Sequence, residues 1–215
     1  MNYPVITNKK HTTSDALKSN AKIFLDELIT KEHRVKNKTY QIIGSAFSNL
    51  RLPMPGEQLR IRTQQQINML AIILSILKKH KLIEELTIVT YTINRDTFNI
   101  ISKLLESGKI KMLNLYIASS YSYRDAEYFN ELKTTLLNLS KLFDCHLTFA
   151  WLHFKITLVK CGESYYHVEG SMNYSQNNMA EQIVFENNKE MYDFDYNMLK
   201  EVLSKKNNNA LEVIC

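Results

Sequence analysis

The feature that most constrains this chain is a hairpin of two short strands predicted between residues 153 and 173. An apolar run from Ile156 to Val159 is followed by Cys161-Gly162-Glu163-Ser164 and by a second run from Ser164 to Val168. Glycine among polar residues between two β-prone runs is typical of a tight turn. The two runs should therefore pair, which brings the residues before the first run next to those after the second.

The two ends of this hairpin carry chemically reactive groups. In an extended strand, residues two apart point to the same face, so we expect His153 and Lys155 to project together and Phe154 to face a core. The turn sequence Gly170-Ser171-Met172-Asn173 should lie beside them. An imidazole, an ammonium, a hydroxyl and a carboxamide at one end of a sheet suit a phosphate, because they supply a nucleophile, a cation and two neutral hydrogen-bonding groups.

These residues resemble the signature of the phospholipase D superfamily, H-x-K-x4-D-x6-G-S-x-N. The residues that match it are His153, Lys155, Gly170, Ser171 and Asn173. Lys160 stands where the family has its aspartate, and the interval before the glycine is roughly three residues longer than the pattern. Glu163 is a candidate for a displaced acid, although growth of the hairpin at its turn would move it away from the site.

The resemblance implies a catalytic role for four residues, namely His153, Lys155, Asn173 and Glu181. Lys155, Ser171 and Asn173 would bind the phosphate. The segment 178–185 is similar to the part of single-motif family nucleases that supplies a carboxylate to the catalytic histidine, which here is Glu181. Family chemistry uses two histidines: one attacks phosphorus to give a phosphohistidine, and the other protonates the leaving oxygen. The resemblance implies no metal and no other cofactor.

Only one copy of the motif is present, and this predicts a homodimer. None of the other histidines begins an H-x-K pattern that is followed by a phosphate-binding turn; they are His11, His33, His80, His146 and His167. His167 lies in the hairpin, but we interpret it as structural. A two-fold dimer would place two copies of His153, Lys155 and Asn173 across one interface.

Length and element order predict one α/β domain. We expect a flexible arm over 1–12, a single phospholipase D-like domain over 13–205, and a polar tail over 206–215. The fold class is α/β, a mixed and mostly parallel sheet flanked by helices on both faces. Helices are expected at 16–29, 64–81, 95–107, 126–143 and 190–205, strands at 39–47, 58–62, 86–92, 112–118, 145–151, 153–159, 164–168 and 182–186, and a basic connector at 31–38.

The net charge permits a polyanionic partner without requiring one. The net charge is +5 and the pI is about 8.9. Arg60 and Arg62 lie two apart on an expected strand and are candidate contacts for a nucleic-acid backbone, with a solvated strand face as the alternative. Tyr123 and Arg124 are candidates for stacking a base, with an ordinary loop as the alternative.

The odd number of scattered cysteines and the lack of a signal peptide or apolar span predict a protein of the cytoplasm, without membrane attachment. The usage of Asn, Lys and Ile is typical of an AT-rich bacterial or phage genome.

We therefore expect a metal-independent phosphodiesterase of the phospholipase D type that cleaves nucleic acid, with DNA as the expected substrate. The first alternative is a non-catalytic module that binds phosphate or DNA in a phage particle or mobile element, which Lys160 favours. The second is a phospholipid phosphodiesterase, although the sequence has no amphipathic membrane-binding stretch.

Overall fold

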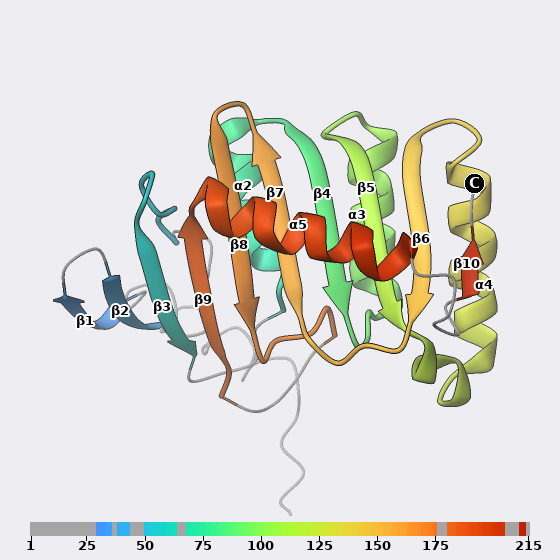
Figure 1. Cartoon of the computed structure of the whole chain (residues 1–215), viewed down its shortest axis with the longest axis horizontal. Coiled ribbons are helices and arrows are strands. Elements are labelled where there is room, and N and C mark those ends of the chain that lie inside the picture. The colour runs from blue at the N-terminus through green and yellow to red at the C-terminus, as the bar shows by residue number, and fades with distance from the viewer. Residues whose placement is uncertain are drawn as a thin grey trace, which may run out of the picture.

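A single ten-stranded sheet organises the molecule (Figure 1). The computed structural model describes residues 29–35, 38–43, 50–63, 68–175, 180–204 and 211–213. The strands are β1 (Ile29–Val35), β2 (Lys38–Ile43), β3 (Gln58–Thr63), β4 (Ile83–Thr90), β5 (Ile110–Ala118), β6 (Asp144–Ala150), β7 (Ile156–Cys161), β8 (Ser164–Gly170), β9 (Gln182–Asn187) and β10 (Leu211–Val213). The helices are α2 (Leu70–His80), α3 (Arg95–Glu106), the 3-10 helix η1 (Ser119–Tyr123), α4 (Ala126–Leu139) and α5 (Lys189–Ser204).

The sheet is mixed, but its strands are mostly antiparallel, so the expectation of a mostly parallel sheet was wrong. The strand order is β1-β2-β3-β9-β8-β7-β4-β5-β6-β10. Of its nine neighbouring pairs, three are parallel (β2–β3, β4–β5 and β5–β6), and the remaining six are antiparallel. The β7–β8 hairpin and β9 lie between β3 and β4. From β4 through β7, β8 and β9 to β3, each strand runs opposite to its neighbour, so every pair in this part of the sheet is antiparallel.

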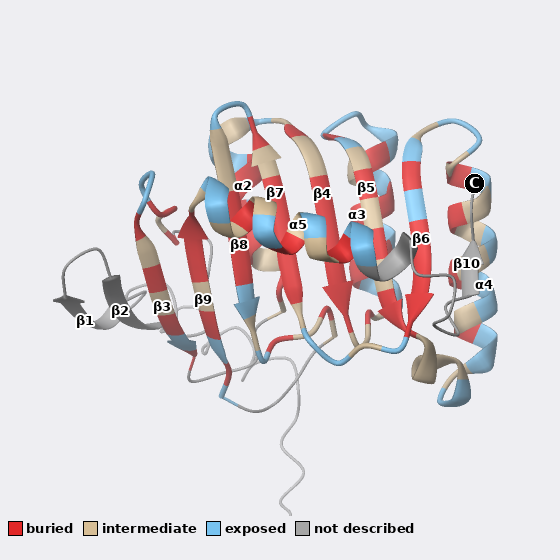
Figure 2. Cartoon of the chain, in the orientation of Figure 1, coloured by how far each residue is buried: buried red, intermediate tan, exposed pale blue. Residues whose placement is uncertain are grey.

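Helices cover both faces of the sheet, as expected. Figure 1 shows α5 crossing one face, while α2, α3 and α4 lie behind the other. The central strands are consequently buried along most of their length (Figure 2). In β4, residues 86–90 are all buried. Burial of five consecutive residues is typical of a strand covered on both sides.

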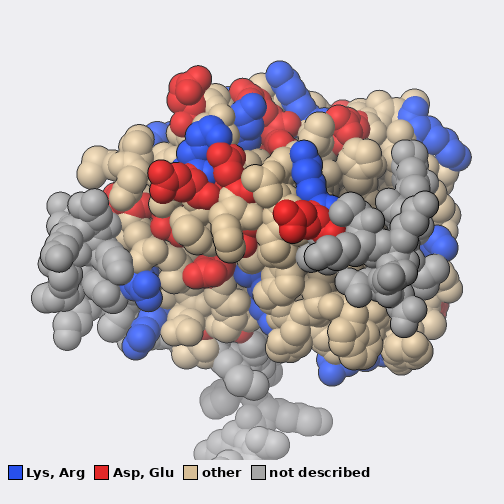
Figure 3. Space-filling view, in the orientation of Figure 1, with Lys and Arg blue, Asp and Glu red and all other residues tan. Residues whose placement is uncertain are grey.

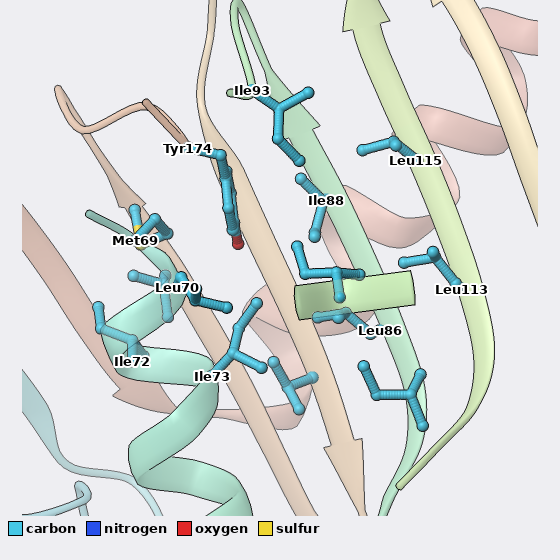
Figure 4. Packing of buried hydrophobic residues seen from close by; sticks show 14 of the residues in the cluster. Met69, Leu70, Ile72, Ile73, Leu86, Ile88, Ile93, Leu113, Leu115 and Tyr174 are labelled. Atoms are coloured by element: carbon cyan, nitrogen blue, oxygen red, sulfur yellow. The ribbon is translucent and has the colours of Figure 1, made fainter. Parts of the chain in front are cut away.

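The larger core lies between the sheet and helices α2, α3 and α4. Ile73 of α2 points toward Leu86 and Ile88 of β4, with Tyr174 nearby, and Ile72 belongs to the same cluster (Figure 4). These side chains are essentially inaccessible to solvent. A second, smaller cluster lies under α5; it comprises Val89, Ile156, Leu158, Tyr192 and Leu199.

Several predicted elements begin or end elsewhere. The connector predicted at 31–38 was wrong, because β1 and the first residue of β2 lie there. Charged residues are tolerated in β1 because it is an edge strand. The tail predicted at 206–215 includes β10, which pairs with β6. The helix predicted at 16–29 lies outside the described residues except for Ile29, which begins β1.

The motif strand is also shorter than predicted. β7 begins at Ile156, so His153 and Lys155 lie in the connection from β6. Phe154 is 40% exposed and does not enter the core, because it precedes the pleated part of the strand. The turn at Gly162, with a φ of +55°, is where the sequence predicted it.

A buried charged cluster joins β8, β9 and α5. His167 is fully buried; its Nδ1 lies 3.1 Å from Glu186 and its Nε2 lies 2.6 Å from Asp195. Burial by itself would lower the pKa of His167, but the hydrogen bonds with Asp195 and Glu186 outweigh burial and raise it to about 9. These contacts support the interpretation of His167 as structural.

This cluster makes stability depend on pH. The pKa of His167 is about 9 in the folded protein and near the ordinary 6.5 in the unfolded chain, so its contribution is complete below pH 6.5 and is lost as pH rises toward 9. We expect the Tm to fall by several degrees over this interval, measured by calorimetry at constant ionic strength. The same series with Asp195→Asn is the control, because it removes one anionic partner and should flatten the slope. A Tm that stays constant or rises over this interval would contradict the assignment.

Candidate functional site

The motif residues gather at one edge of the sheet, the lower edge in Figure 1. Strands β3, β4 and β8 end there, and β7 and β9 begin there. The amide of Gly170 lies 3.4 Å from the carbonyl oxygen of Lys155. The hairpin therefore brings residues 153–155 next to the glycine-serine turn, as the sequence predicted.

His153 presents its ring to solvent in the connection before β7. The ring lies edge-on to Tyr91, with 5.5 Å between their centroids. The guanidinium of Arg124 lies 5.1 Å from the centre of the same tyrosine ring. Lys155 donates a hydrogen bond from Nζ to the carbonyl oxygen of His153 at 2.9 Å. An exposed imidazole with a cation close by can reach a phosphate that arrives from solvent.

Ser171 joins the turn after β8 to the start of β9. Its hydroxyl donates to the carboxylate of Glu181 and accepts from the amide of Gln182 at 3.1 Å. The Ser171 amide donates to the Gln182 carbonyl at 3.0 Å. Glu181 is buried, and its amide donates to the hydroxyl of Thr63 at 3.0 Å. The serine and the glutamate are thus held together by three strands.

Asn173 is held between the end of β4 and the start of α2. The Thr90 hydroxyl lies 3.4 Å from Oδ1 of Asn173, and the Met69 amide lies 3.4 Å from its carbonyl oxygen. The next residue, Tyr174, is buried and bonds Thr157 at 2.6 Å. The backbone at Asn173 is therefore anchored beside the serine turn, and its carboxamide lies next to Thr90.

Lys160, at the position where the resemblance would have an aspartate, lies away from these residues. It is near the other end of β7, five residues beyond Lys155 or about 17 Å along a strand. It forms an ion pair with Glu84 at 3.3 Å, and the hydrogen bond with Glu84 raises the pKa of Lys160. Glu163 lies in the exposed turn at that same end. The side chain at position 160 therefore takes no part in the edge that holds His153.

Arg60 and Arg62 of β3 lie beside the motif rather than on an isolated solvated face. They line a pocket of about 420 Å³ on the α5 side of the sheet, next to the motif residues. The other lining residues that matter for its chemistry are Phe154, Lys155, Glu169 and Gly170. Figure 3 shows basic side chains gathered over the lower end of β3.

The two remaining candidates differ in their surroundings. Tyr123 is 88% exposed at the end of η1. Arg124 packs on Tyr91 and so lies close to His153. Tyr91 was missed by sequence reasoning, because a tyrosine after a buried strand has no distinguishing pattern. Thr63 and Thr90 were also missed, because their hydroxyls reach the site only once strands distant in sequence have paired.

Within the described ranges, no three or more His, Cys, Asp or Glu side chains converge as a metal site. Glu186 and Asp195 lie against opposite nitrogens of His167, so their carboxylates cannot share an ion. The helices among these residues are too short or too polar to cross a membrane.

Comparison with known proteins gives a structural likeness only. No family model and no curated protein matches the chain. Among solved structures, the chain is similar to Nuc from Salmonella typhimurium, a phospholipase D family member, with a TM-score of 0.50 and 10% identity over 71% of this chain and 98% of that chain. An archaeal chromatin protein, TrmBL2, gives a TM-score of 0.40 and 12% identity over 68% of this chain and 53% of that chain, which supports no inference. The chain therefore has a phospholipase D-like α/β fold.

The geometry makes a prediction for Gly170. A Cβ added there would lie 2.2 Å from the Gln182 carbonyl oxygen and 2.9 Å from the Ile183 Cα, so β8 and β9 would have to separate. We expect Gly170→Ala to destabilise the fold by about 1–3 kcal/mol in chemical unfolding. Glu169→Ala is the control, because it changes the neighbouring, exposed position of β8 and adds no atom between β8 and β9. Equal losses in the two variants would contradict the close approach of the strands.

Proposed function

We propose that this protein is a phosphodiesterase of the phospholipase D type that cleaves nucleic acid without a metal. One observation carries the proposal: on a phospholipase D-like fold, the sheet brings His153 and Lys155 to the same edge as Ser171, Asn173 and Glu181. The fold alone would not suffice, because one fold hosts many functions. The edge supplies a nucleophile, a cation and hydrogen-bonding groups for a phosphate, and the second histidine of the reaction would come from a partner copy.

In the proposed reaction, a ring nitrogen of His153 attacks phosphorus, and the bond from phosphorus to the leaving oxygen breaks. A second histidine donates its proton to that oxygen. Water then attacks the phosphohistidine, its proton goes back to the second histidine, and free His153 and a phosphomonoester result. Lys155 and the Asn173 carboxamide would stabilise the charge on the non-bridging oxygens.

Glu181 would act on this site through its neighbours. In the single-motif phospholipase D nucleases that this sequence resembles, a carboxylate holds the catalytic imidazole. Here the Glu181 carboxylate accepts a hydrogen bond from Ser171. We assign it the role of a positioning residue that keeps the serine turn in place. His153 would turn from Tyr91 toward the phosphate, since its ring is exposed and lies in a connection rather than a strand.

Nucleic acid is the proposed substrate because cations extend beyond the catalytic residues. Arg60 and Arg62 share a pocket with Lys155. The guanidinium of Arg124 and the ring of His153 both contact the ring of Tyr91, so Arg124 also lies near the site. A polyanion engages several cations at once, whereas one isolated phosphate does not. The non-catalytic alternative rested on Lys160, whose pairing with Glu84 lies outside the site.

The test is cleavage of single- and double-stranded DNA by the purified chain in the presence of a chelator. His153→Ala should lower turnover at least about a thousandfold, because it removes the nucleophile, and should leave DNA affinity largely intact. His146→Ala is the matched control, since His146 is also exposed but lies at the start of β6, paired with Asp144. Wild-type turnover in His153→Ala would contradict the proposal. Tight DNA binding without cleavage would support a non-catalytic DNA-binding module. A preference for phospholipid vesicles over DNA would support a phospholipid phosphodiesterase.

The need for a second histidine leads to the prediction of a homodimer with both copies of His153 at one interface. Light scattering at micromolar concentration should give twice the chain mass of 25.2 kDa. A fully active strict monomer would exclude this arrangement.

A further inference from the structure

The pocket beside the motif lies on the α5 side of the sheet, at the junction of β3, β9, β8 and β7. Register places Arg60 opposite Val184, Val184 opposite Glu169, and Glu169 opposite Ile156. The pocket therefore spans four adjacent strands. Figure 1 shows α5 running from β9 toward β6, so the helix does not cover β3, where Arg60 lies.

The charge of this pocket is predominantly positive. Arg60, Arg62 and Lys155 contribute three cations, and Glu169 contributes one carboxylate. Among the residues that the structure describes, none of the three cations forms an ion pair. Three cations beside one carboxylate leave the pocket with an excess of positive charge, and an anion bound among them relieves the repulsion that remains.

Arg60 is held in its place by the buried charged cluster. Its Nε donates to Oε1 of Gln58 at 3.0 Å, and Nε2 of Gln58 donates to Glu186 at 3.2 Å. Glu186 is in turn bonded to His167. This connection fixes the side chain through Nε, and the two terminal amino groups remain to form the paired hydrogen bonds that arginine makes with phosphate.

The remaining walls are apolar and aromatic. Phe154, Ile156 and Val184 line the pocket, and Phe154 is 40% exposed. A volume of about 420 Å³ is within the range of small-molecule sites. A cationic end with an aromatic wall matches one nucleotide, since arginines bind its phosphate and an aromatic ring stacks on its base.

We propose that this pocket is a subsite for the nucleotide next to the cleaved bond, with Arg60 and Arg62 binding its phosphate. Lys155 lines the pocket and donates a hydrogen bond to the carbonyl oxygen of His153, so the pocket adjoins the proposed reaction site, and neighbouring phosphates of one backbone would occupy the two. The inference rests on the proposed function, because the neighbouring site must hold the phosphate that is cleaved. The subsite makes the enzyme prefer polynucleotides to isolated phosphodiesters.

The test compares two ligands in the full-length His153→Ala protein, which cannot cleave them. The thymidine dinucleotide TpT has one phosphate and the trinucleotide TpTpT has two. By calorimetric titration, TpTpT should bind about tenfold or more tightly than TpT, because Arg60 and Arg62 form charge-assisted hydrogen bonds with its second phosphate. Adding Arg60→Gln and Arg62→Gln should reduce this gain to about twofold or less.

The control adds Lys109→Gln and Lys111→Gln to the His153→Ala protein, which removes the same charge. Both lysines are exposed near the start of β5, at the end of the sheet opposite the motif. The gain from the second phosphate should persist in this control. A gain that survives loss of both arginines, or no measurable binding of either ligand, would overturn the subsite.

The outcomes separate this subsite from the proposed activity. If the wild-type protein cleaves DNA but the His153→Ala protein shows no gain from the second phosphate, the proposed function stands and the subsite is rejected. A protein that cleaves nothing yet shows the gain, with the arginines required for it, would keep the subsite and lose the function.

Discussion

The close pairing of β8 with β9 at Gly170 is the interaction on which the candidate site depends. The glycine lets the backbone of Gln182 approach so closely that no side chain fits between the strands. Ser171 can then bond both Gln182 and Glu181, and the turn that carries Asn173 is fixed against β4. Wider separation of β8 and β9 would remove both Ser171 contacts together, so one position couples sheet geometry to site geometry.

The same strands divide the site between two faces of the sheet. On the side of α2, α3 and α4, the large core holds Tyr174 and anchors the serine turn. On the side of α5, the sheet leaves room for the arginine-lined pocket, because the helix starts beyond β3. The edge where His153 lies joins the two faces. A phosphate at that edge and a neighbouring group in the pocket could then belong to one ligand.

The buried cluster around His167 links stability to this pocket. Its two carboxylates hold a charged imidazole under α5, and Glu186 also orients Arg60 through Gln58. Removing one partner from such a cluster leaves a buried charge unpaired, which is costly. Folding therefore favours the cluster with both carboxylates in place, and Glu186, through Gln58, then holds Arg60 in its orientation.

The sequence by itself determined the hairpin, its turn at Gly162, the helices on both faces and the group of motif residues, because these follow from local apolar periodicity, turn chemistry and spacing. Tertiary structure alone decided the mostly antiparallel sheet, the strand β1 in a basic segment and the pairing of β10, since strand partners are chosen by contacts distant in sequence. It also decided that Lys160 pairs with Glu84 away from the edge, and that Arg60 and Arg62 share a pocket with Lys155. Residues from separate strands become neighbours only when the sheet assembles, and no local pattern records that order.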